Sequence, residues 1–140
     1  MHKAHIAGLA AMFQACLSIG AAAPVLADPM PKDFIGIWTD ETGCGKGVHK
    51  MIFTTAGITI IQDDGRKKSV LIDASGNPDE RLEVRVSKVT AGEEQDPVGA
   101  HVGDVLVLRR VKGAVQLIGY GDATVVHDTP DGPVMHRCPS

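Results

Sequence analysis

The stretch LEVRVSKVT, residues 82–90, decides the fold class. Its apolar residues Leu82, Val84 and Val86 alternate with charged and polar ones, so an extended chain has one apolar face and one hydrophilic face. This alternation is typical of an antiparallel sheet that covers a core on one side and meets water on the other. The segment therefore predicts a half-buried β-strand.

Similar short runs rich in Val, Ile, Leu and Thr recur along the chain, separated by Gly, Asp, Asn and Pro. We expect strands at 34–39, 49–54, 57–62, 68–73, 82–90, 104–111, 114–120, 123–128 and 133–138. The run VLVL at 105–108 does not alternate, which predicts burial on both faces. Many short strands with edges to hide favour an all-β fold, a small antiparallel β-barrel of about eight strands.

Turn residues predict how several strands connect. Gly65 in DDGR stands where a positive φ is wanted, and VKGA can close a tight hairpin at Lys112 and Gly113. Two longer connections, at 74–80 and 91–103, are expected to be loops, where binding surfaces usually lie.

The last two predicted strands, 123–128 and 133–138, are expected to form a hairpin around TPDG, a type I turn with Gly132 in the left-handed position. Two registers are open. In one, His127 and His136 lie diagonally on one face; in the other, with Gly132 as a bulge, His136 turns to the opposite face.

The first 27 residues have the layout of a secretory signal peptide, with Lys3 near the start, an apolar run from Ile6, and a small-residue end at Ala27. We therefore expect a single mature domain at 28–140, periplasmic or secreted, without a membrane span. The net charge of −3 is mildly acidic, which gives the chain no general attraction for nucleic acid.

Three cysteines occur, and Cys16 lies inside the predicted signal peptide. The remaining two, Cys44 and Cys138, have only each other as partners in an oxidising compartment. We expect a disulfide that closes nearly the whole mature chain.

The stretch FIGIWTDETGC, residues 34–44, resembles the first strand of lipocalins and avidins, the calycin barrels, through the GxW pair Gly36 and Trp38. The resemblance implies that Trp38 plugs the closed end of a barrel and that Arg137, from the last strand, packs across its ring. It also implies a ligand-contacting role for Asp40. Cys44 stands where avidins have a biotin-contacting serine, and no second tryptophan is present to wall a biotin pocket.

Catalytic and metal-binding motifs are missing from the sequence. It has no GxSxG elbow and no HExxH or HxH spacing, and its acidic residues fall mainly in predicted turns. We therefore expect no enzyme activity, no cofactor and no metal. Among the few aromatic residues, Tyr120 is the one expected to expose its polar end, which makes it a candidate ligand contact.

These observations predict a non-catalytic binding protein, either monomer or homodimer. Its expected partner is a small apolar ligand inside the barrel or a partner protein held outside it. The alternatives are an envelope inhibitor of proteases or lysozymes that acts through its loops, and a structural envelope protein without a specific ligand. A carrier predicts a cavity lined by Ile and Val, whereas an inhibitor predicts a filled barrel with protruding loops.

Overall fold

A computed structural model describes residues 28–92 and 101–139. These residues form one short 3₁₀ helix and nine strands: η1 (Lys32–Phe34), β1 (Gly36–Thr39), β2 (Lys50–Phe53), β3 (Gly57–Ile61), β4 (Lys67–Asn77), β5 (Arg81–Ala91), β6 (Val105–Val111), β7 (Ala114–Gly121), β8 (Val126–Asp128) and β9 (Val134–Cys138). The predicted signal peptide at 1–27 and most of the predicted loop at 91–103 lie outside the described residues. No helix in the described ranges is long and apolar enough to span a bilayer.

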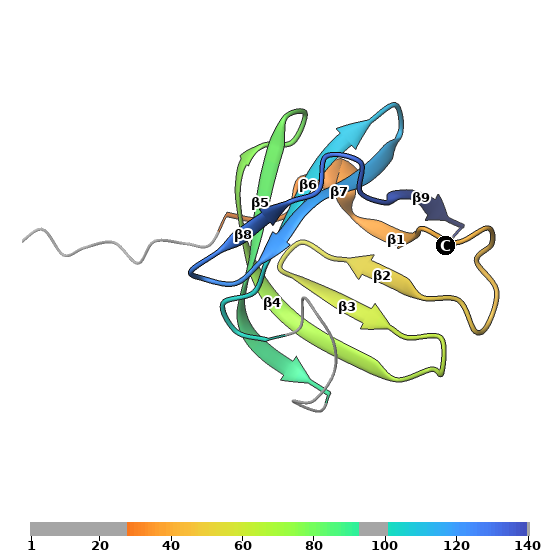
Figure 1. Ribbon diagram of the computed structural model, residues 1–140. Helices are drawn as coiled ribbons and strands as arrows, with labels where there is room; N and C mark the ends of the chain where they lie inside the picture. The colour runs from red at the N-terminus through yellow and green to blue at the C-terminus, as the bar shows by residue number, and fades with distance from the viewer. Residues whose placement is uncertain (1–27, 93–100, 140) are drawn as a thin grey trace, which may run out of the picture.

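Eight of the strands close into an antiparallel barrel, which confirms the predicted fold class (Figure 1). Strands β1 to β7 follow one another around the sheet, and β9 lies between β7 and β1. β9 closes the barrel by pairing on both sides. Its Arg137 lies opposite Trp38 of β1, and its Met135 lies opposite Val115 of β7. β8 pairs only with β7 and extends the sheet beyond the closed part.

The two ends of the barrel differ. At the end where β1 begins, here called the plugged end, η1 and the preceding residues cover the core: Met30 and Phe34 are buried in it. The β4–β5 and β6–β7 hairpins project together at this end (Figure 1). At the opposite end, here called the loop end, lie the connections 40–49, 62–66 and 122–125.

Inward-facing side chains fill the barrel. The central residues Ile72, Val84 and Leu108 are at most 2% exposed and belong to one continuous core cluster. The run Val105–Leu108 is buried on both faces, as its lack of alternation predicts. Val105 and Val107 belong to a small separate cluster with Ile118, against which Val126 of β8 packs.

Two predicted turns are confirmed by backbone geometry. Gly65, between β3 and β4, has a φ of 87°. Lys112 and Gly113, between β6 and β7, have φ values of 39° and 78°, the two positive values that a tight I′ hairpin turn requires.

The prediction of a loop at 74–80 is wrong. β4 continues through Asn77, and only Pro78–Glu80 connect it to β5. Ala74 lies opposite Val84 and is buried, so the row of inward side chains runs on past the predicted strand end at residue 73. Glycine is required at position 76 of the ladder, because a Cβ there would collide with the carbonyl oxygen of Arg81.

The predicted hairpin of 123–128 with 133–138 is also wrong. Both segments pair with β7 and run in the same direction along it: His127 lies opposite Tyr120, and Val134 opposite Gln116. The predicted TPDG turn closes with a hydrogen bond from Gly132 N to Thr129 O, but it links β8 to β9, which lie one after the other along β7. Gly132 is not among the glycines with positive φ.

Candidate functional site

The plugged end is organised around Trp38, which is 2% exposed. Its indole Nε1 donates a 2.8 Å hydrogen bond to the carbonyl of Phe34. The guanidinium of Arg137 lies 4.5 Å from the centre of the indole ring, the contact implied by the calycin resemblance. Arg137 also donates to the carbonyl oxygens of Ile35 and Asp33, at 2.6 and 2.7 Å. One arginine thus joins β9, β1 and the segment that covers the core.

Gly36 makes this stacking possible. Its φ of 147° lies in a region that favours glycine, and a Cβ at this position would collide with the Arg137 guanidinium. The glycine of the GxW pair therefore provides space for the cation that lies over the tryptophan.

A second arginine secures the same end. The guanidinium of Arg110 lies 5.5 Å from the centre of the Phe34 ring and pairs with the carboxylates of Asp33 and Asp79. The hydrogen bond to Asp33 raises the pKa of Arg110. Since both arginines are held by neighbouring groups, we assign this end a structural role.

The predicted disulfide is present between Cys44 and Cys138, whose Cα atoms are 5.7 Å apart. It ties the 40–49 connection of the loop end to the last residue of β9. Asp40, the other residue implied by the calycin resemblance, is exposed at the start of this connection.

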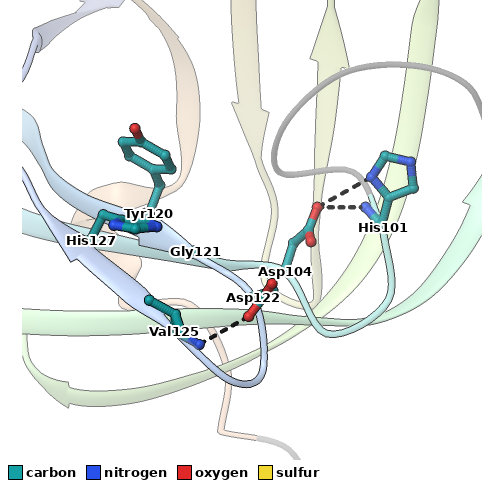
Figure 2. Close-up of a pocket in the computed structure, with 7 residues that line it drawn as sticks. All are labelled: His101, Asp104, Tyr120, Gly121, Asp122, Val125 and His127. Carbon is teal, nitrogen blue, oxygen red and sulfur yellow. Dashed lines mark hydrogen bonds and ion pairs between the residues drawn. The ribbon is translucent and has the colours of Figure 1, made fainter.

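An open pocket of about 280 Å³ lies at the loop end, between the β5–β6 connection, the end of β7 and β8 (Figure 2). The pocket is lined by His101, Asp104, Tyr120, Gly121, Asp122, Val125 and His127. Of the sequence-predicted candidates, only Tyr120 lines it.

Tyr120 lies near the end of β7, on the face of the strand that points into the barrel. It lies opposite Leu106, a core residue, and opposite His127 of β8. Because residues directly opposite one another share a face, the tyrosine and histidine rings lie on the same side, with centres 5.8 Å apart. At this end of β7 Tyr120 is 40% exposed.

Two aspartates supply the negative charge of the pocket. Asp122 Oδ1 accepts hydrogen bonds from Thr124 Oγ1, Val125 N and Thr124 N, at 2.7 to 2.9 Å. These bonds, first that of the Thr124 hydroxyl, lower the pKa of Asp122 to about 2. Asp104 Oδ2 accepts from the backbone N of His101 at 3.0 Å and lies 3.4 Å from its Nδ1 (Figure 2).

Two exposed valines add apolar area, Val125 of the pocket lining and Val102, the neighbour of His101 in the chain. Val125 is 53% exposed, and Val102, which directly follows His101, is 66% exposed. We call Val102, Tyr120, Val125 and His127 the Tyr120 surface. The sequence indicates only Tyr120 of this surface, because the two valines lie in segments predicted as a loop and as a hairpin strand.

The two histidines of the predicted hairpin, His127 and His136, do not come together. His127 lies opposite Tyr120 on β7, whereas His136 lies opposite Thr39 on β1, so the expected hairpin geometry does not arise. Within 28–92 and 101–139, no three His, Cys, Asp or Glu residues are placed to hold a metal ion.

The architecture defines the chain as a closed eight-stranded antiparallel β-barrel protein with one disulfide, compatible in form with a calycin-like barrel. Comparison of the chain with protein-family models, with curated proteins and with solved structures found no match.

Proposed function

We propose that this chain is a non-catalytic binding protein that holds a partner protein on the Tyr120 surface and uses its barrel as a rigid scaffold. The observation that carries the proposal is a contrast in burial. Central barrel residues such as Val84 and Leu108 are almost fully buried by one another, whereas Tyr120, Val102 and Val125 expose apolar area beside an open pocket. Exposed apolar side chains that gather around a concave site are typical of protein-interaction surfaces.

A packed interior favours a partner outside the barrel over a small apolar ligand inside it. The pocket beside Tyr120 contains an aromatic ring, aliphatic groups and an aspartate that stays ionised, a mixture suited to the anchor side chain of another protein. An inhibitor of an envelope protease or lysozyme would use such a surface.

We also propose that the protein lies in the periplasm or outside the cell, and that its barrel is related to those of lipocalins and avidins. The predicted signal peptide and the Cys44–Cys138 disulfide support the location. The stacking of Arg137 on Trp38 beside Gly36 supports the relation. Mass spectrometry of the protein purified from its own cells tests the location, since a secreted chain is expected to begin at Asp28.

Site-specific photo-crosslinking in the native cell tests the surface. A photoreactive residue at position 120 is expected to give a defined protein adduct, whereas the same residue at Leu71, which is also 40% exposed, is expected to give none. With the captured partner purified, Tyr120→Ala should weaken binding roughly tenfold or more while the fold is retained.

Equal adducts at positions 120 and 71 would contradict the proposed surface. A small molecule that stays bound in the native mass spectrum and leaves on unfolding would favour the carrier alternative instead.

A further inference from the structure

A second pocket, of about 330 Å³, lies at the loop end on different elements from the Tyr120 surface. The β1–β2 connection and the beginning of β2 form one side, and the β3–β4 turn with the flanking strand ends forms the other. Its lining comprises Lys46, Gly47, Val48, Lys50, Ile61, Gln62, Asp63, Asp64, Gly65 and Lys67. We call it the lysine pocket.

Strand register sets two of its lysines on either side of an isoleucine. Lys50 of β2 lies opposite Ile61 of β3, and Ile61 lies opposite Lys67 of β4. Residues directly opposite one another share a face, so the ammonium groups of Lys50 and Lys67 flank the aliphatic side chain of Ile61. Lys46 adds a third cation from the connection held by the Cys44 disulfide.

None of these three lysines forms an ion pair or side-chain hydrogen bond with the residues that the structure describes. The two aspartates of the turn do not neutralise them: Asp64 pairs with Arg66, and Asp63 has no ion pair in the described ranges. The arginines at the plugged end are instead held by carboxylates and carbonyl groups.

A fourth ammonium group lies behind the row. Lys68 follows Lys67 on the opposite face of β4 and is 3% exposed, and its Nζ has no hydrogen-bond partner among the described residues. Its positive charge adds to the potential at this corner and is less screened than that of a surface lysine.

We infer that the lysine pocket is a second binding surface, which docks an acidic peptide segment of a partner protein. Carboxylates of the segment would pair with Lys46, Lys50 and Lys67, and an aliphatic side chain between them would cover Ile61. Charge complementarity selects this occupant. An anionic membrane fits less well, because its flat surface would also meet the rest of a chain of net charge −3, whereas a short peptide segment meets only the pocket.

This second surface goes beyond the proposed function, and Tyr120 enters its test only as a control. The probe is a fluorescein-labelled peptide that alternates Glu and Val, and its anisotropy is measured with the disulfide-bonded protein. The matched control peptide has Gln for every Glu. The variant is Lys46→Gln/Lys50→Gln/Lys67→Gln, and the charge-matched control is Lys32→Gln/Lys88→Gln/Lys112→Gln, which removes three lysines outside the pocket.

We expect the Glu peptide to bind and the Gln peptide to bind at least about tenfold more weakly. The pocket variant should lose roughly tenfold in affinity, the control variant less than about twofold, and raising salt from about 50 to about 500 mM should abolish binding. The salt series on the wild-type protein needs no variant, so it tests the inference even if the triple substitution impairs folding.

Three results would overturn the inference: no binding of the Glu peptide at about 1 mM protein, equal losses in the pocket and control variants, or equal binding of the Glu and Gln peptides. Binding to phosphatidylglycerol vesicles that the pocket variant loses, without binding of the peptide, would identify a membrane as the occupant instead. The Tyr120→Ala variant should bind the peptide normally, which separates failure of this inference from failure of the proposed function.

Discussion

At the plugged end, the guanidinium groups of Arg137 and Arg110 lie over aromatic rings and are held by neighbouring oxygen atoms. At the loop end, the ammonium groups of the lysine pocket lack ion pairs with described residues, and the apolar side chains of the Tyr120 surface face solvent. The two arginines at one end are therefore held by neighbouring groups, whereas the lysines and exposed apolar side chains at the other end have no such partners among the described residues. This difference suggests that the plugged end maintains the fold while the loop end makes contacts.

The largest effect is expected from Trp38→Ala, which removes a buried ring together with the hydrogen bond to Phe34 and the stacking of Arg137. We expect a loss of about 3 to 5 kcal/mol in the free energy of unfolding, measured by urea denaturation. Tyr120→Ala at the loop end should cost less than about 1 kcal/mol. Equal losses at the two ends would contradict the contrast between them.

Cys138→Ser should cost about 4 kcal/mol, because the disulfide closes a loop with a sequence separation of 94 residues and restricts the unfolded chain. Calorimetry under oxidising conditions measures the change. Cys44→Ser should have the same effect, and the double variant should add nothing further. A larger loss in the double variant than in either single variant would show that the cysteines also act separately.

Gly36→Ala should lower stability by about 1 to 3 kcal/mol, since the added methyl group must displace the Arg137 guanidinium and the backbone φ is unfavourable for alanine. Thermal unfolding compares it with Gly43→Ala at the loop end, where no atom lies within 4 Å of the added Cβ. Comparable losses at both glycines would argue against a special role for Gly36 in the plug.

The plugged end was more predictable from sequence than the loop end, for a physical reason. Tryptophan, glycine and the paired cysteines impose contacts that few alternatives satisfy, so short motifs indicate them. The Tyr120 surface depends on how β8 and β9 share β7, and the TPDG turn reads equally well as a hairpin or as an excursion. The lysine pocket arises from strand register across β2, β3 and β4, which no local pattern specifies.

The pattern of apolar residues predicted the burial of the strands correctly but not all of their ends. Alternation at 82–90 and its absence at 105–108 identified burial correctly, because side-chain period reports directly on the two faces of a strand. The extension of β4 through Gly76 was missed because serine, glycine and asparagine favour turns locally. Pairing of Ala74 with Val84 and of Gly76 with Leu82 overrides that preference.

Lys68→Met is expected to raise stability by about 1 to 3 kcal/mol, because it replaces a buried ammonium group, which has no hydrogen-bond partner in the described ranges, by an apolar side chain of similar length. Urea denaturation measures the gain. Lys67→Met, on the exposed face of the same strand, serves as the control and should give little or no gain. A loss of stability in Lys68→Met would show that the buried amine is favourable where it lies.

The smallest effect concerns Asp122, whose pKa is lowered to about 2 by the hydroxyl of Thr124 and by the backbone N–H groups of Val125 and Thr124. Since the folded chain depresses this pKa from its ordinary value of 3.8, the ionised carboxylate contributes stability above about pH 4. That contribution should disappear as the pH falls from about 4 to about 2. Asp122→Asn should remove this part of the pH dependence of unfolding while leaving the acid response of the plugged end unchanged.

Nuclear magnetic resonance titration of the Val125 and Thr124 amides measures the ionisation of Asp122 locally. A global unfolding measurement would combine it with the titration of other groups. In the wild-type protein both resonances should shift with a midpoint near pH 2, and in Asp122→Asn they should not titrate in that range. A midpoint near the ordinary aspartate value would show that the 122–125 turn is not held by this carboxylate. In that case Asp122 would still be ionised at neutral pH, but its charge would not be held in place beside Tyr120 by the bonds of the turn.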